Sequence, residues 1–269
     1  MDNGFYPEVG KYYDADAADF DSRYWRNPVL QQIRQSFREE VKRYPFKNIL
    51  EVGCGTGIDL LHFAYIHPQA EVQGIDISEQ MVSLTQLKIS ESNLTNVHAY
   101  IAKVEDLPLL FPDRKFDMIY VFFGALNTVD NLYNNAAILG NMLHSDGKMV
   151  LTFVNKWYIG GMVLEALRFR VRRAMARISP VWGGYSPAKY LPSKCYSPRT
   201  VKDAFYGYTM IKHQGYSIMH PAWYFTGINK RLGKLRKLLW KTDIWLNKTP
   251  FWQFGEYTLF TFQKRDRSV

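Results

Sequence analysis

The sequence predicts an α/β fold, in which a mostly parallel sheet is covered by helices on both faces. Two observations carry this prediction. Five short apolar runs between residues 48 and 154 alternate with helical patterns, and this alternation is typical of parallel strands with crossover helices. A glycine-rich turn, Gly53-Cys54-Gly55-Thr56-Gly57, joins the first apolar run to the first helical pattern. The length of 269 residues suits one large domain, or one domain that carries an insertion.

The elements follow in order along this region. The predicted strands are NILEVG (48–53), EVQGID (71–76), VHAYIA (97–102), FDMIYVFF (116–123) and KMVLTFV (148–154). The predicted helices between them are Asp59–Tyr65, Glu79–Ser90 and Asn131–Leu143. Because such sheets bind ligands beyond the carboxyl ends of their strands, the residues that follow strands are candidates for a site. These residues are Gly53–Gly57, Asp76, Lys103–Glu105, Phe122–Asn127 and Asn155.

Further elements are predicted on either side of this region. A helix is expected at Pro28–Arg43, and amphipathic basic helices are expected at 157–178 and at Asn229–Leu246. Ser197 is a suitable N-cap and Pro198 a suitable first residue for another helix. The segments 209–219 and 255–264 are predicted to form a pair of strands.

The glycine turn limits the class of ligand. Glycine permits positive φ and lets a ligand approach the backbone closely. A phosphate-binding P-loop needs Lys-Ser/Thr after its last glycine, whereas Ile58 and Asp59 follow here. A dinucleotide fingerprint needs Gly-x-Gly-x-x-Gly, whereas Gly57 comes one residue early. A ligand that contains adenosine but no phosphate remains as the candidate.

The segment E-V-G-C-G-T-G resembles the first motif of the class I S-adenosylmethionine-dependent methyltransferases. The resemblance continues at Asp76 in GIDIS, at Ser78-x-x-Met81 and at VEDLPL, Val104–Leu109. FDMIYVFFGALNTV resembles the family's fourth strand and its exit, and LHSDGKMVLTF resembles the turn into the fifth strand. The resemblance covers about residues 45–155, and residues 155–200 lie where relatives carry a cap over the acceptor pocket.

The resemblance implies a Rossmann-like seven-stranded sheet with helices on both faces, an antiparallel last strand pair and a cap insertion. The implied regions are N-terminal lid helices (1–45), a donor-binding core (46–154), the cap (155–200) and a C-terminal completion of the sheet (201–269), with its basic helix at about 229–246. The implied cofactor is S-adenosylmethionine, which leaves as S-adenosylhomocysteine. The implied binding residues are Tyr13, Glu51, Gly53, Cys54, Gly55, Gly57, Asp76, Ile77, Met81, Val104, Glu105 and Phe122.

Several of these residues have implied roles. Asp76 accepts hydrogen bonds from the ribose hydroxyls, and Met81 packs on adenine. A lid tyrosine closes over the cofactor, with Tyr13 as the candidate and Tyr12 and Tyr24 as rivals. Many relatives carry an acid at the position of Lys103. Lysine cannot accept the hydrogen bond of the adenine amino group, so the backbone or Glu105 would have to substitute.

The catalytic residues are less well indicated. The sulfonium is already an activated methyl donor, so the protein mainly has to position the reactants and exclude water. A general base is needed only for an acceptor whose proton has a high pKa. Asn127 and His220 are the two candidates near the acceptor. Asn127 could equally cap the following turn, and a residue such as His220 is more often packed and hydrogen-bonded than catalytic. The six histidines and two cysteines do not cluster as metal ligands, and we expect no metal site.

The charge is divided unevenly between the two halves. Residues 1–155 hold 13 Lys and Arg against 20 Asp and Glu, whereas residues 156–269 hold 21 against 5. The predicted cap combines five arginines with six large aromatic residues. The arginines are Arg168, Arg170, Arg172, Arg173 and Arg177, and the aromatic residues are Trp157, Tyr158, Trp182, Tyr185, Tyr190 and Tyr196. Such a surface could lie on an anionic membrane and admit a lipid or quinone, or it could simply be a solvated basic face.

Three functions therefore stay open. The first is a methyltransferase of a hydrophobic, lipid-like or quinone-like small molecule. The second is a methyltransferase of a soluble anionic metabolite or natural-product precursor. The third is a non-catalytic or RNA-binding relative, although we expect no nucleic acid partner because no Asn-Pro-Pro-Tyr type motif follows the fourth strand. Without a signal peptide or a long apolar run, we expect a cytoplasmic protein, with peripheral membrane contact as an option. The sequence does not indicate the oligomeric state.

Overall fold

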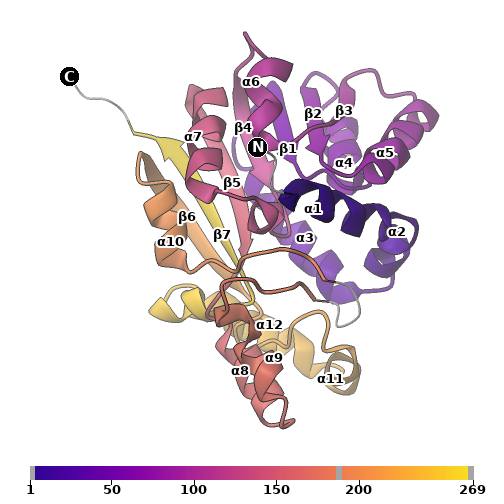
Figure 1. Cartoon of the computed structure of the whole chain (residues 1–269). Helices are drawn as coiled ribbons and strands as arrows, with labels where there is room; N and C mark the ends of the chain where they lie inside the picture. The colour runs from indigo at the N-terminus through magenta and orange to yellow at the C-terminus, as the bar shows by residue number, and fades with distance from the viewer. Residues whose placement is uncertain (1–3, 186–189, 266–269) are drawn as a thin grey trace.

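The computed structural model describes residues 4–185 and 190–265, and it shows one seven-stranded sheet between two layers of helices (Figure 1). The strands are β1 (Asn48–Val52), β2 (Glu71–Asp76), β3 (Val97–Ile101), β4 (Phe116–Val121), β5 (Leu143–Val154), β6 (Tyr208–Tyr216) and β7 (Tyr257–Lys264). Their order is β3-β2-β1-β4-β5-β7-β6. The first five strands are mutually parallel, and β7 is antiparallel to both β5 and β6. The predicted fold class is therefore confirmed.

Four of the α-helices in the described part of the chain begin at a residue whose side chain caps them. The α-helices are α1 (Phe5–Asp14), α2 (Ala17–Trp25), α3 (Pro28–Val41), α4 (Ile58–Ile66), α5 (Glu79–Ser92), α6 (Leu107–Leu110), α7 (Leu132–Met142), α8 (Ile159–Ala166), α9 (Val171–Met175), α10 (Pro198–Ala204), α11 (Thr226–Arg231) and α12 (Leu235–Leu246). Short 3₁₀ helices are η1 (Val104–Asp106), η2 (Ala125–Thr128), η3 (Ala176–Ile178) and η4 (Pro250–Phe254). Asn27, Ser78, Asn131 and Ser197 accept backbone N–H bonds at the starts of α3, α5, α7 and α10, which satisfies donors that a helix leaves free.

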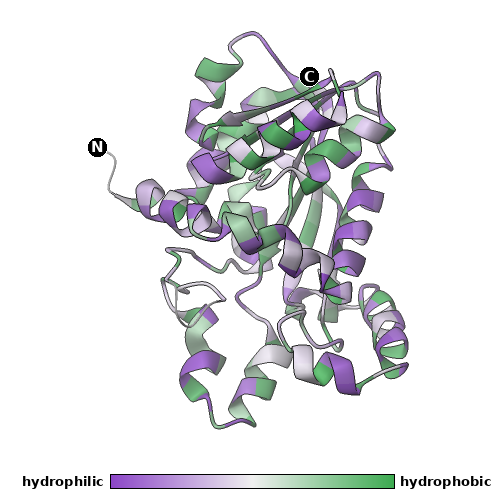
Figure 2. Cartoon of the chain, turned by 90° about the vertical axis from the view of Figure 1, so that its right-hand side faces the viewer, coloured by the Kyte–Doolittle hydropathy of each residue, from purple (hydrophilic) through white to green (hydrophobic). Residues whose placement is uncertain are grey.

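The core has two layers because neighbouring residues of each strand point to opposite faces of the sheet. Ile49 packs in the layer formed with α3, α4 and α5, while the next residue, Leu50, packs in the layer formed with α6, α7 and α10. Figure 2 shows the central strands mostly hydrophobic and the surrounding helices with alternating hydrophobic and hydrophilic residues. The sheet therefore holds the ends of its strands in fixed positions for a site.

Two predicted basic helices are interrupted. The segment 157–178 divides into α8, α9 and η3, with Phe169 between the first two in the left-handed conformation at φ 57°. The segment Asn229–Leu246 divides between α11 and α12 near Gly233, at φ 50°. A left-handed residue ends the run of helical hydrogen bonds, so each segment turns a corner. The prediction of one continuous helix was wrong in both places.

The connection between β6 and β7 packs against the 155–200 segment. Tyr158, Ala222 and Phe225 form a small buried cluster, and the Ala222 N–H donates to the Tyr158 hydroxyl over 3.2 Å. Figure 1 shows α8, α9, α11 and α12 gathered at one end of the molecule, below the sheet. In the part of the chain that the structure describes, no helix has the length and apolar character needed to cross a membrane.

Candidate active site

The glycine turn after β1 is shaped by its protein neighbours as well as by an open cavity. Gly53, Gly55 and Gly57 all have positive φ, at 75°, 53° and 78°. A Cβ at Gly53 would lie 2.4 Å from the Ala125 Cβ, and one at Gly57 would lie 2.7 Å from the Thr85 Cγ2. A Cβ at Gly55 would meet only the ring of Phe20, at 3.8 Å. Gly53 and Gly57 therefore allow close packing, whereas Gly55 leaves its backbone open.

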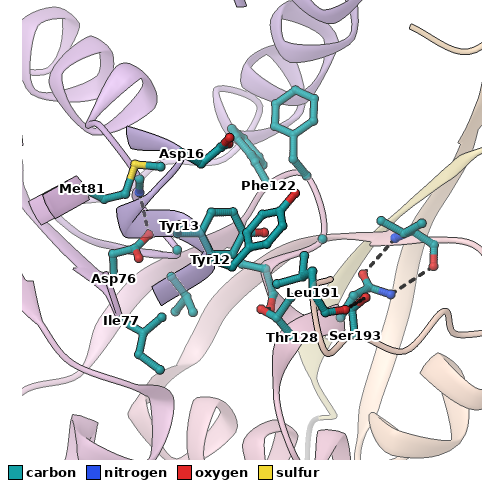
Figure 3. A pocket seen from close by; sticks show the side chains of 18 of the residues that line it. Tyr12, Tyr13, Asp16, Asp76, Ile77, Met81, Phe122, Thr128, Leu191 and Ser193 are labelled. Carbon is teal, nitrogen blue, oxygen red and sulfur yellow. Dashed lines mark hydrogen bonds between the residues drawn. The ribbon is translucent and has the colours of Figure 1, made fainter. Parts of the chain in front are cut away.

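Asp76 ends β2 and fixes the same turn. Its Oδ2 accepts the Gly55 N–H over 2.8 Å, and its Oδ1 accepts the Ser78 N–H over 2.9 Å. Burial raises the pKa of Asp76, and the backbone N–H donors oppose that shift. A carboxylate has further lone pairs after two such bonds, and Asp76 lines a cavity (Figure 3). It can therefore accept hydrogen bonds from hydroxyl groups of a ligand there.

The cavity has a volume of about 530 Å³ and runs from the glycine turn to the cap. Eight of the twelve predicted cofactor residues line it: Tyr13, Gly53, Gly55, Asp76, Ile77, Met81, Val104 and Phe122. Their mixture of an acid, open backbone and apolar side chains suits a ligand made of an adenine ring, a ribose and an amino-acid tail. Thus the residues present fit the donor that the sequence implies.

The other four predicted cofactor residues lie outside the lining. Glu51 is buried in β1 and accepts the Tyr120 hydroxyl over 2.8 Å, and burial together with Asp59 raises its pKa well above the usual value. Cys54 is buried, and burial raises its thiol pKa, so it is not a reactive thiolate.

Gly57 and Glu105 have packing and hydrogen-bonding roles next to the cavity. Gly57 serves the packing of α4 against Thr85. Glu105 accepts the Tyr6 hydroxyl over 2.5 Å and the Asn135 amide over 2.8 Å. It therefore holds α1 near the cavity. Its Oε2 is buried and has no hydrogen-bond partner among the described residues, but Glu105 does not line the cavity, so it is not placed to replace the acid missing at Lys103.

The N-terminal helices form one wall of the cavity. Tyr12, Tyr13 and Tyr24 all line it, and Figure 3 shows the rings of Tyr12 and Tyr13 between Asp76 and Leu191. Burial raises the pKa of Tyr13, so its phenol stays neutral. Asp14 accepts the Ser78 hydroxyl over 2.6 Å and the Gln80 N–H over 3.1 Å. This hydrogen-bonded attachment fixes α1 over the cavity.

The two candidate catalytic residues differ in position. Asn127 lines the cavity, but its amide donates to the carbonyl oxygens of Val154 and Lys194, and its oxygen accepts the Val154 N–H. It therefore ties η2 to β5 and the cap. His220 does not line the cavity, and its Nδ1 lies 2.8 Å from the Pro221 carbonyl oxygen. Burial lowers the pKa of His220. Neither side chain is placed to remove a proton from an acceptor.

The cap end of the cavity is an aromatic chamber, which we define as Phe123, Trp182, Tyr185, Trp223, Tyr224 and Tyr257. The rings of Trp182 and Trp223 meet that of Tyr185 edge to face, with centroids 4.5 and 5.0 Å apart. Trp182 and Tyr185 were predicted from the sequence as aromatic residues of the cap, whereas Trp223, Tyr224 and Tyr257 were not predicted. The aromatic run WYF at 223–225, next to Pro221, was the available signal.

Comparisons with known proteins agree with this geometry. The sequence model of a family described as "Methyltransferase domain" matches residues 45–182, just over half of the chain. An uncharacterized protein of Methanocaldococcus jannaschii is 28% identical over 87% of this chain and 84% of its own length. The ubiquinone/menaquinone biosynthesis C-methyltransferase UbiE of Geotalea daltonii is 27% identical over 65% of this chain and 73% of its own length.

Solved structures share the fold. The mycolic acid cyclopropane synthase CmaA1, complexed with S-adenosylhomocysteine and CTAB, has a TM-score of 0.62 at 15% identity, over 96% of this chain and 98% of its own. A possible histamine N-methyltransferase from Thermotoga maritima has a TM-score of 0.58 at 15% identity, over 96% and 100% of the two chains. The chain belongs to the methyltransferase-domain family and is a class I S-adenosylmethionine-dependent methyltransferase.

Proposed function

We propose that this methyltransferase transfers its methyl group to a hydrophobic small molecule of the lipid or quinone type. The aromatic chamber carries the proposal. Six rings and Leu191 surround the acceptor end of the cavity, and such walls favour a planar, apolar acceptor. The names of UbiE and of the demethylmenaquinone methyltransferase of Listeria monocytogenes describe quinone methylation and support a quinone-like ring; the latter is 36% identical over 31% of this chain and 35% of its own length.

The residues divide the work between donor and acceptor. Asp76, Gly55, Met81 and Tyr13 would hold S-adenosylmethionine, which supplies an electrophilic methyl group when bound. Trp223 and its neighbours orient the acceptor and exclude water. Positioning of this kind is worth up to roughly 7–11 kcal/mol of the barrier. Because the activity depends mainly on placement, the shape of the chamber should decide which molecule reacts.

Two acceptors with one ring system test this proposal. A prenylated naphthohydroquinone and its unprenylated, carboxylated analogue are incubated with donor that carries a trideuterated methyl group, and the products are measured by mass spectrometry. Higher kcat/KM for the prenylated compound is expected. Preference for the carboxylated compound would favour the soluble anionic acceptor, and donor binding without turnover of either compound would favour a non-catalytic relative.

A variant links turnover to the chamber. Trp223→Ala is expected to raise KM for the prenylated acceptor about 3- to 10-fold, since an aromatic contact is lost. The affinity for S-adenosylhomocysteine should not change, because Trp223 lies at the cap end of the cavity. An unchanged KM would contradict the assignment of the chamber to the acceptor.

We further propose that the enzyme meets a lipid-like acceptor at an anionic membrane surface. The corner between α8 and α9, residues 167–173, exposes Leu167, Phe169 and Val171 by 73%, 93% and 65%. Arg168, Arg170 and Arg172 alternate with them, and Arg173 follows Arg172 directly. Arg168 and Arg170 pair with Glu165, and no salt bridge of Arg172 or Arg173 is found among the described residues. Apolar side chains among cations favour an anionic interface.

Vesicle co-sedimentation tests the membrane contact. Vesicles that contain phosphatidylglycerol should bind the protein, neutral phosphatidylcholine vesicles should bind it less, and salt should weaken binding. Phe169→Asp should reduce binding. Leu109→Asp is the matched control, because Leu109 is 86% exposed and lies in α6, at the other end of the molecule (Figure 1). Equal loss in both variants, or equal binding to both lipids, would argue against this corner as the contact.

A further inference from the structure

A buried acid lies directly behind the aromatic chamber. Glu256 has no exposed surface and immediately precedes β7. Its Oε1 accepts the Tyr185 hydroxyl over 2.5 Å and the Arg177 Nη2–H over 3.2 Å. Its Oε2 is buried and has no hydrogen-bond partner among the described residues. Burial raises the pKa of Glu256, and Arg177 and Tyr185 oppose that shift. A carboxylate held in this way is only partly satisfied as an anion.

Arg177 keeps other partners if Glu256 becomes neutral. Its Nη1 donates to the carbonyl oxygens of Asn155 and Glu256 over 3.2 and 3.4 Å. Its guanidinium carbon also lies 4.9–5.6 Å from the ring centroids of Tyr158, Trp182 and Tyr185. A buried cation that loses its ion-pair partner usually destabilises the fold strongly. Here the carbonyl oxygens and the ring faces still stabilise Arg177. Glu256 can therefore change its charge inside the fold.

Tyr185 connects this acid to the cavity. Tyr185 lines the cavity, and its hydroxyl lies 2.5 Å from Glu256 Oε1 and 2.9 Å from the Tyr257 hydroxyl. Burial and the neighbouring Glu256 raise the pKa of Tyr185 well above its usual value. The phenol therefore does not persist as an anion. The Tyr185 hydroxyl can therefore accept a proton only if it gives its own proton to Glu256 at the same time.

We propose that Tyr185 and Glu256 form a proton relay that deprotonates a hydroxyl-bearing acceptor during methyl transfer. The acceptor oxygen forms a bond to the methyl carbon as the methyl–sulfur bond breaks. The O–H proton of the acceptor passes to Tyr185 Oη, and the Tyr185 proton passes to Glu256 Oε1. Tyr185 is thus the catalytic residue and Glu256 acts through it. This inference rests on the proposed function and narrows the acceptor to molecules with an ionisable hydroxyl, such as a phenol or hydroquinone.

The charge balance favours such a relay. Before the transfer, the sulfonium is positive and Glu256 is negative; afterwards the thioether, the methylated acceptor and the protonated acid are all neutral. The transfer thus removes the sulfonium charge and the Glu256 charge together, while Arg177 keeps its own charge against the carbonyl oxygens and ring faces described above. The titratable groups that face Glu256 are Arg177, Tyr158, Tyr185, Cys195, Tyr224 and Tyr257. Burial raises the pKa of these tyrosines and of Cys195, to about 12 for the thiol. Glu256 is therefore the proton acceptor among them, because a carboxyl group has a much lower ordinary pKa than a phenol or a thiol.

Kinetics of three variants test the relay with the prenylated naphthohydroquinone. Glu256→Gln and Tyr185→Phe are expected to lower kcat about 100-fold or more, with the S-adenosylhomocysteine affinity unchanged. Wild-type kcat should rise with pH as Glu256 loses its proton, and this rise should disappear in Glu256→Gln. Tyr158→Phe is the control, because it removes a buried cap hydroxyl that does not line the cavity. Wild-type rates and pH profiles in both relay variants would overturn the inference.

A second acceptor separates proton removal from structural support. A nitrated phenol that is already ionised at the assay pH needs no base, so the ratio of wild-type to Glu256→Gln rates should fall to within about 3-fold. A merely structural role of Glu256 would lower both acceptors' rates equally. That equal loss would overturn the relay.

A titration tests Glu256 without turnover. In protein labelled with ¹³C at the glutamate carboxyl, the resonance absent from Glu256→Gln is followed with pH by NMR. A midpoint above that of ordinary glutamates, shifted by Tyr185→Phe, is expected. A midpoint at or below the ordinary value overturns the relay even if an acceptor is methylated. Failure of every hydroxyl acceptor, with the raised midpoint present, counts instead against the proposed acceptor class.

Discussion

Arg34 and Arg38, one helical turn apart on α3, both pair with the carboxylate of Asp59 at the start of α4. Of the two, Arg34 lines the cavity, where its guanidinium lies 4.5 Å from the ring centroid of Tyr24 and 4.6 Å from that of Phe123. Burial and Asp59 raise the pKa of the neighbouring Glu51 well above its usual value. The two guanidinium groups share the carboxylate of Asp59, and Arg34 is the one of the two that can also pair with an anionic ligand group in the cavity.

Arg34→Met is expected to weaken binding of S-adenosylhomocysteine about 10-fold or more, because the charge-assisted hydrogen bond between Arg34 and the carboxylate of the ligand is lost. Binding of 5′-methylthioadenosine, which lacks that carboxylate, should change little. Titration calorimetry measures both affinities. Arg38→Met is the matched control, because it also leaves Asp59 with one arginine but does not line the cavity. If Arg34→Met weakened the binding of both ligands equally, the variant would have a general defect of the site instead.

Substitutions at two glycines should separate stability from binding. Gly57→Ala should lower the free energy of unfolding by about 3 kcal/mol, since it adds left-handed strain to a clash with Thr85. Gly55→Ala should cost only about 1 kcal/mol, because its new methyl group meets only the ring of Phe20. That methyl group should nevertheless weaken donor binding about 10-fold. Urea unfolding and calorimetry measure the two effects; the reverse ranking of stability would contradict the packing described at Gly57.

The attachment of α1 should control the exchange of the donor. Asp14→Ala removes the bonds from Ser78 and Gln80, so α1 should move away from the cavity more often and S-adenosylhomocysteine should dissociate about 3- to 10-fold faster. Stopped-flow displacement measures this rate. Asp19→Ala on α2 serves as a control on an exposed acid. An unchanged dissociation rate in Asp14→Ala would mean that aromatic contacts, and not these hydrogen bonds, hold α1 in place.

Asp243 should make stability depend on pH. It accepts N–H bonds from Ile218, Met219 and His220, yet burial raises its pKa to about 6 from 3.8. A carboxyl whose pKa is raised by folding stabilises the protein fully below its unfolded pKa, and this contribution is lost as pH rises through the folded pKa.

The difference in unfolding free energy between wild type and Asp243→Asn should therefore fall by roughly 3 kcal/mol between about pH 4 and pH 8. Urea titrations at several pH values give this difference. A difference that increases with pH would mean that the three N–H donors dominate over burial.

The donor half of the molecule was predictable because its signals are local. The strand before Gly53, the turn itself and Asp76 follow each other within a short stretch, and eight of the predicted residues line the cavity. Ser197 was recognised as a cap for the same reason, since its partner, the Thr200 N–H, is three residues away.

The acceptor half was less predictable because its contacts join distant segments. Tyr185 meets Trp223 and Glu256, 38 and 71 residues further along the chain, and no periodic pattern marks such a pairing. Gly233 was a visible signal of a helix break, whereas Phe169 has no local feature that favours a left-handed conformation. Asn127 reached the cavity as expected, but only the structure shows that backbone groups occupy its amide.

The aromatic chamber is built by connections between strands, and this affects how such enzymes can diversify. Trp182 and Trp223 belong to two connections that cover the cavity, and neither contributes a strand to the sheet. These connections can therefore accumulate changes while the turn that receives the donor stays intact. Grafting both of them together from a homologue should exchange the preferred acceptor, whereas grafting either alone should leave mismatched rings and a poorly selective enzyme.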